Sequence, residues 1–123
     1  MPNRMVPRAE WFKFLRGFSR RHEDEPVTVR ILNRDFGSQV EASNLPLEGV
    51  LAGRRASGPI SISAGRAPGG TVEHEIQDPS QVWIKLSETG AEEALDIESQ
   101  DGTRTIIQLL PHSPGTPSAP LPR

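Results

Sequence analysis

The chain has no cysteine and no tyrosine, and its only aromatic residues are two tryptophans and four phenylalanines. The missing cysteines exclude a disulfide framework, a zinc–thiolate site and a thiol nucleophile. Bases of single-stranded nucleic acids bind by stacking on aromatic rings, and this chain supplies few of them. We therefore expect neither a metal–thiolate protein nor a nucleic-acid-binding protein.

Long apolar runs are also missing. No stretch approaches the roughly 18 consecutive apolar residues that a membrane-spanning helix requires, and residues 1–8 lack the apolar core of a secretory signal. The sequence thus predicts a cytoplasmic protein without a transmembrane segment of its own. Peripheral attachment at the cytoplasmic face of a membrane stays open.

What the chain does contain is a modest apolar content of 34%, together with 12 prolines and 11 glycines. A chain of 123 residues supports one core, since two smaller cores would each be hard to stabilise. We expect an N-terminal extension over residues 1–7, a single domain over 8–110 and a proline-rich tail over 111–123.

Charge is spread unevenly along the chain, although its net charge is only −2. Residues 1–21 hold six basic side chains against Glu10 alone, whereas the remainder holds eight basic and fifteen acidic ones. Such asymmetry is typical of a contact surface for an anionic partner, but it also fits an ordinary solvated helix face. Arg16 and Arg20 are the candidate contact residues within this basic segment.

The spacing of apolar residues predicts one amphipathic helix over residues 8–22. Pro7 suits the start of a helix, and at about 100° per residue the side chains of Trp11, Leu15 and Phe18 fall on one face. Arg16 lies on the opposite face. We expect the apolar stripe to be buried against the rest of the domain.

After Pro26 the apolar period changes from 3.6 to 2, which indicates β-strands. About eight short stretches of this kind follow one another, separated by turns rich in glycine, proline, asparagine and aspartate. The sequence therefore predicts a mainly β protein. We expect about eight short antiparallel strands, arranged as a sandwich or small barrel with the N-terminal helix packed on it.

No catalytic, metal or cofactor motif stands out in the sequence. His74 shares its strand face with Val72 and Ile76, while Glu73 and Glu75 alternate to the opposite face and so cannot join it in a metal site. We expect no metal and no cofactor. An inward-facing His74 still leaves room for a pocket beside it.

Trp83 lies on the face of its strand opposite the apolar Val82 and Ile84. Either both faces of that strand are covered, or Trp83 is exposed and serves as an interface anchor. The tail offers a second candidate for partner binding, because its prolines recur every third residue and match the turn of a polyproline II helix. These are Pro111, Pro114, Pro117 and Pro120.

Four segments carry a resemblance to a known family: Glu10 to Ser19, Leu45 to Val50, His74 to Ile76, and Glu93 to Gly102. Over about residues 7–110 the chain resembles a family of small bacterial proteins, domain of unknown function 5335. The resemblance implies a single compact domain of bacterial origin and implies no activity or ligand.

Two functions remain open. The first is a non-enzymatic accessory or structural subunit that docks onto a larger protein assembly, such as a membrane complex at its cytoplasmic face. The second is a small-molecule-binding module or minor enzyme with its pocket near His74.

Overall fold

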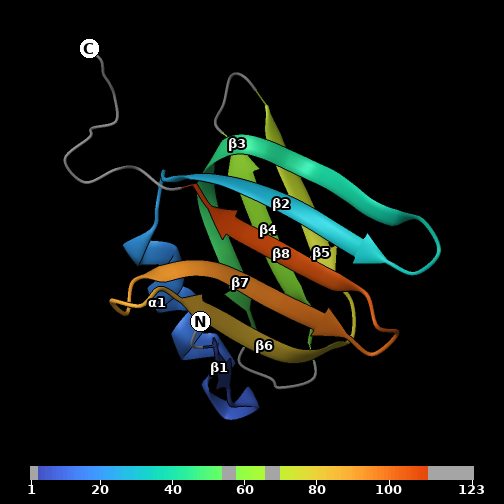
Figure 1. Cartoon of the computed structure of the whole chain (residues 1–123), viewed down its shortest axis with the longest axis horizontal. Helices are drawn as coiled ribbons and strands as arrows, with labels where there is room; N and C mark the ends of the chain where they lie inside the picture. The colour runs from blue at the N-terminus through green and yellow to red at the C-terminus, as the bar shows by residue number, and fades with distance from the viewer. Residues whose placement is uncertain (1–2, 54–57, 66–69, 111–123) are drawn as a thin grey trace.

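The computed structural model describes residues 3–53, 58–65 and 70–110 (Figure 1). A short 3-10 turn, η1 (Arg8–Glu10), leads directly into the helix α1 (Trp11–Arg21). The strands are β1 (Asn3–Val6), β2 (Pro26–Asn33), β3 (Gly37–Ala52), β4 (Ile60–Gly65), β5 (Thr71–Ile76), β6 (Pro79–Leu86), β7 (Glu92–Ser99) and β8 (Arg104–Leu109).

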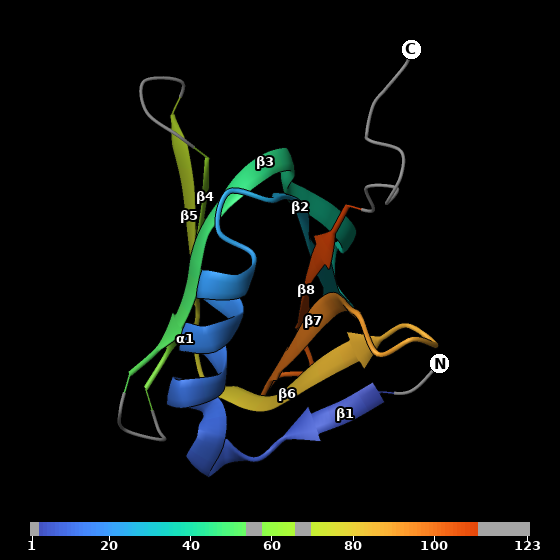
Figure 2. The same ribbon diagram turned by 90° about the vertical axis from the view of Figure 1, so that its left-hand side faces the viewer.

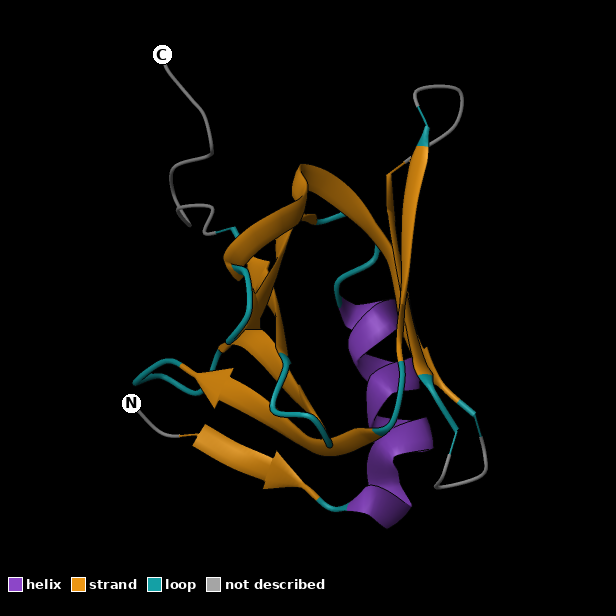
Figure 3. Cartoon of the chain, turned by 90° about the vertical axis from the view of Figure 1, so that its right-hand side faces the viewer, coloured by secondary structure: helices purple, strands orange, loops and turns teal. Residues whose placement is uncertain are grey.

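All eight strands belong to one antiparallel sheet, in the order β1-β6-β7-β8-β2-β3-β4-β5. The prediction of about eight antiparallel strands with an N-terminal helix packed on them is confirmed. Between the two arrangements left open, the sheet is closer to a barrel: it curls around α1, with β1 and β5 as its two ends (Figure 3). One wall consists of β6, β7, β8, β2 and the first part of β3, and the other of the second part of β3 with β4 and β5, with α1 between them (Figure 2).

The curl originates in β3, which pairs with β2 through its first part and with β4 through its second. From the alternation of apolar residues alone, two separate strands would be expected here, with a break between about Ala42 and Leu47. In the structure β3 runs on through 16 residues, because a register shift between Ala42 and Leu45 and a left-handed Asn44, with φ of 56°, bend the strand without ending it. Bulges of this kind increase local twist.

The core fills the space between α1 and the two walls. Leu15 and Phe18 are fully buried and Trp11 is 4% exposed, so the predicted burial of the helix stripe is confirmed. Around them pack apolar side chains from all eight strands, including Val6, Val29, Leu47, Val50, Ile62, Ile76, Ile84, Leu95 and Ile107.

Hydrogen bonds also tie the helix to β3. The Ser19 hydroxyl lies 2.8 Å from the backbone nitrogen of Val50 and 2.9 Å from its carbonyl oxygen. The turn after the helix pairs with the same strand, since Asp24 N–H donates to the Leu47 carbonyl and Leu47 N–H donates to Glu25. Before the start of β2, therefore, α1 and its turn occupy the place of a strand beside β3.

Residues Asn3–Val6 were expected to be part of an N-terminal extension, but they form β1. This strand pairs with β6, where Val6 lies opposite Val82 and is buried in the core. The four residues are too short to show a clear alternation in sequence, and their pairing with β6 spans about two thirds of the chain.

Candidate docking surface

Six side chains form a row across the sheet face that points away from α1. Met5 and Val40 are 48% and 49% exposed, while Trp83 and Ile106 are half-buried. The outward face of an antiparallel sheet is usually polar, so this apolar band is unusual. The strand register places its members side by side: Met5, Trp83, Asp96, Ile106, Arg30 and Val40, here called the outer row.

Trp83 lies near one end of the outer row, between Met5 and Asp96. Its indole Nε1 donates a hydrogen bond to Oε1 of Gln81, at 3.2 Å. The helix packs against the opposite face of the sheet, where Val82 and Ile84 are buried. The sequence left two alternatives, a strand covered on both faces or an exposed Trp83. The structure lies between them: Trp83 is half-buried, and α1 does not cover it.

Asp96 is only 8% exposed, although it belongs to the outward face. Arg104 on the adjacent strand compensates for this burial by donating through Nε and Nη2 to both carboxylate oxygens. The hydrogen bonds and the charge of Asp96 raise the pKa of Arg104 above its ordinary value. The outer row has two charged members. Asp96 is buried and paired with Arg104, whereas Arg30 is exposed.

The basic residues of the N-terminal segment divide into two groups. Three contact their own domain: the guanidinium groups of Arg4 and Arg21 lie 5.8 and 5.7 Å from the ring centre of Phe14, and Arg8 lies 4.4 Å from that of Trp11. The other three, Lys13, Arg16 and Arg20, are exposed on α1. They form the basic stripe, which contains both of the predicted contact residues.

A cluster of charged and polar side chains joins the end of α1 to the start of β7. His22 lies between two carboxylates, with Nδ1 2.9 Å from Glu25 and Nε2 2.7 Å from Glu92. Arg21 completes the cluster by donating two hydrogen bonds to Glu92, at 3.0 and 2.8 Å. Sequence analysis had no signal for this cluster, because Glu92 is 70 residues away from His22.

Opposing effects act on Glu92. Burial raises the pKa of its carboxyl group, but the hydrogen bonds from Arg21 and His22 and their charges outweigh burial and leave the pKa below the ordinary value of 4.5. A carboxyl group whose pKa is lower in the folded state stabilises the fold above its unfolded pKa. That contribution is lost as the pH falls through the folded value.

Glu92→Gln is therefore expected to destabilise the protein at neutral pH and to flatten its acid sensitivity. The difference from the unsubstituted protein should shrink as the pH falls below 4.5. Urea unfolding curves, measured from neutral pH down to the acid range, test this expectation. Glu88→Gln, in an exposed turn nearby, is the matched control, and equal pH profiles for the two variants would contradict the prediction.

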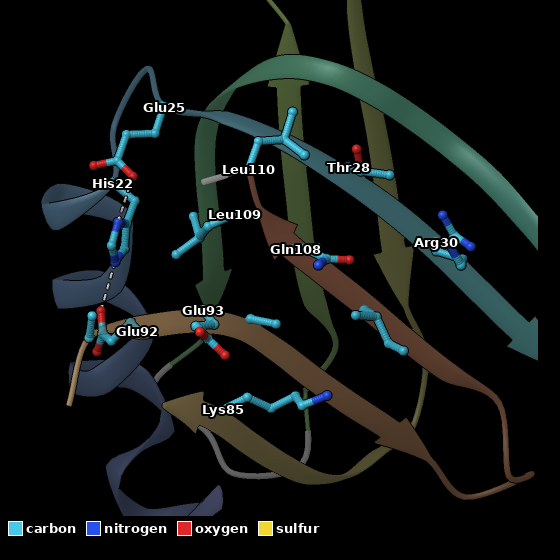
Figure 4. A pocket seen from close by; sticks show the side chains of 13 residues that line it. His22, Glu25, Thr28, Arg30, Lys85, Glu92, Glu93, Gln108, Leu109 and Leu110 are labelled. Carbon is cyan, nitrogen blue, oxygen red and sulfur yellow. Dashed lines mark hydrogen bonds and ion pairs between the residues drawn. The ribbon is translucent and has the colours of Figure 1, made fainter. Parts of the chain in front are cut away.

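A shallow hollow of about 740 Å³ lies beside the outer row, where the end of α1 meets the outward face of the sheet (Figure 4). Ala94, Ile106 and Leu109 supply apolar lining, and Arg30 and Lys85 supply positive charge. Two members of the outer row, Arg30 and Ile106, thus also line the hollow.

The lining of this hollow does not include His74, so the hollow is not the pocket expected beside that residue. His74 is half-buried on β5 opposite Ile62, on the same face as Val72 and Ile76, as predicted. Glu73 and Glu75 are exposed on the other face. Within the described parts of the chain, no group of three or more histidine, aspartate or glutamate side chains could hold a metal ion.

Pro111, Pro114, Pro117 and Pro120 lie outside the described residues, so the binding role predicted for the tail stays a prediction. Among the residues that the structure does describe, no helix is both long enough and apolar enough to cross a membrane.

Comparison with known proteins gives the chain a family. The chain is 24% identical over 114 residues to an uncharacterised protein of Aquifex aeolicus (strain VF5), an alignment that covers 93% of this chain and 97% of the relative. No solved structure matches this chain. The sequence model of a family of unknown function, DUF5335, matches residues 2–117 and extends past the expected range at both ends. This chain belongs to that family.

Proposed function

We propose that the protein is a non-enzymatic accessory subunit that docks onto a partner protein through the outer row. The observation that supports the proposal is the set of four exposed or half-buried apolar side chains in this row, on a sheet face that α1 leaves uncovered. Tryptophan and arginine are the side chains that most often dominate binding energy at protein interfaces. Trp83 and Arg30 both belong to this row.

The chemistry of the row also defines the partner. Met5, Trp83, Ile106 and Val40 require an apolar surface that can cover them. Arg30 requires a carboxylate, because within the row Asp96 is already paired with Arg104. The expected partner is therefore a protein with an apolar patch that carries at least one acidic side chain.

The basic stripe on α1 adds a proposal about location. Lys13, Arg16 and Arg20 are exposed together and carry a positive charge that suits an anionic surface. The cytoplasmic leaflet of a membrane is such a surface, and so is an acidic subunit of a membrane complex. We therefore propose that the protein is cytoplasmic and lies at the periphery of a membrane complex.

Substitution of Trp83 tests the docking role. Trp83→Ala should change the free energy of unfolding by only about 1 kcal/mol, since the ring is half-buried. It should weaken binding to the partner by about 30-fold or more, as expected for an interface anchor. A photo-crosslinking residue in place of Gln81, which is exposed beside Trp83, is compared with one at the exposed position of Glu88 and identifies the partner in cells. Calorimetry with the purified partner measures the affinity.

Three outcomes of this experiment would count against the proposal: equal crosslinking from the two positions, an affinity that Trp83→Ala leaves unchanged, or a product that contains two copies of this chain. A second variant, with Arg16→Glu and Arg20→Glu, tests the basic stripe separately. It should slow association most strongly at low salt, because exposed charges are screened beyond about 8–10 Å at physiological ionic strength.

The hollow favours a second candidate function, the binding of a small molecule. Its volume falls within the range of ligand sites, about 300–1,000 Å³, and Arg30 and Lys85 would suit an anionic group. Lys85→Ala should then abolish the binding of an anionic ligand and leave docking at Trp83 intact. Competition between ligand and partner is expected, because Arg30 and Ile106 belong to both surfaces.

A further inference from the structure

The strand β5 ends the sheet on the side away from the outer row. It pairs with β4 from Ile60↔Ile76 to Gly65↔Thr71. Along its other edge it has no neighbouring strand among the residues that the structure describes. The backbone N–H and C=O groups of such an edge can form a ladder with an added strand.

The two faces of β5 differ strongly in chemistry. On the inward face, Ile76 is buried while Val72 and His74 are only half-buried. On the outward face, Glu73 and Glu75 are exposed, and Glu75 accepts a hydrogen bond from Gln77 at 2.7 Å. Since side chains of neighbouring strands meet on the same face, an added strand would contact apolar groups on one side and carboxylates on the other.

A second copy of this chain does not suit this edge. Two copies of β5 that pair about a two-fold axis must place odd-numbered residues opposite odd-numbered ones. The central registers then set Glu73 opposite Glu75 or opposite itself, and like charges directly opposite each other destabilise a strand pair. The acidic face therefore disfavours self-pairing and selects for a strand of opposite charge.

We propose that the free edge of β5 binds an extended, basic segment of another protein, which adds to the sheet as a ninth strand. In this segment lysine or arginine alternates with apolar residues. The basic side chains face Glu73 and Glu75, and the apolar ones extend the inward surface formed by Val72 and Ile76. This site lies on a different element from the outer row, so failure of either proposal leaves the other standing.

The test uses two synthetic peptides of eight residues and the full chain. One peptide alternates lysine with valine, and its matched control alternates glutamate with valine. The unsubstituted protein should bind the lysine peptide at least about tenfold more tightly, because two cross-strand pairs change from attraction to repulsion in the control. Amide NMR shifts should change in residues 71–76 and not in β1, the strand at the other end of the sheet.

A charge reversal distinguishes this mode from general attraction and from misfolding. Glu73→Lys with Glu75→Lys should bind the glutamate peptide and lose the lysine peptide, and an unfolded variant could not gain binding in this way. Reversal at Glu88 and Glu93, which lie outside β5, serves as the control and should leave the preference unchanged. The proposal fails if neither peptide binds, if both bind equally, or if the shifts lie outside β5.

Discussion

Leu15→Ala is expected to lower the free energy of unfolding by about 2–5 kcal/mol, as other large-to-small changes in a core do. Leu15 is fully buried at the centre of the helix stripe, in contact with a core drawn from both walls of the sheet. Removing its three outer carbon atoms leaves a cavity that neither wall can close, because a single continuous sheet fixes their spacing. Urea unfolding, followed by circular dichroism, measures the loss.

Lys13→Ala is the matched control for this experiment. It lies on the exposed face of the same helix, so it changes helix propensity without changing the core and should shift stability by about 0.5 kcal/mol or less. If Leu15→Ala were no more harmful than Lys13→Ala, the helix stripe would not contribute to the core as the structure indicates.

Ser19→Ala is expected to cost about 1–3 kcal/mol, which is a large effect for the loss of one oxygen atom. The Ser19 hydroxyl accepts a hydrogen bond from Val50 N–H and can donate to the Val50 carbonyl or to Leu15. All of these contacts are buried. Alanine keeps the helix but leaves the Val50 N–H without its acceptor in a place that water does not reach.

Hydrogen exchange gives this prediction a local readout. The amide of Val50 should exchange faster in Ser19→Ala than in the unsubstituted protein, by more than the global loss of stability explains. Arg20→Ala, at the exposed neighbouring position, should leave that amide unchanged. Equal protection of Val50 in both variants would mean that the hydroxyl does not hold β3.

Local periodicity predicted much of this architecture. The 3.6-residue spacing of Trp11, Leu15 and Phe18 identified the buried helix face, and the alternation along β5 and β6 placed His74 and Trp83 on their correct faces. The sequence pattern gave less information on the bends within strands and on the pairing of strands that are distant in sequence. The left-handed Asn44 resembles a turn in sequence, although β3 continues through it.

The candidate surfaces depend even more on distant pairing. No local pattern indicates that Met5 lies beside Trp83 or that Ile106 lies beside Arg30, because strand order determines both contacts. The same reason hid the contact between His22 and Glu92. A sequence pattern could therefore assign a side chain to a face, but the row and the cluster required the topology.

The order of strands in the sheet has a consequence for synthesis of the protein on the ribosome. The strand β1 pairs with β6, and β2 pairs with β8. During synthesis, β1 and β2 therefore cannot form these pairs until β6 and β8 have been made. At about 5–20 residues per second, this delay lasts several seconds. During that time α1 can already pack on β3 and β4, whereas the wall formed by β6, β7 and β8 does not yet exist. The nascent chain therefore exposes part of its helix stripe until β6, β7 and β8 have been synthesised, and we expect it to be a substrate for ribosome-associated chaperones.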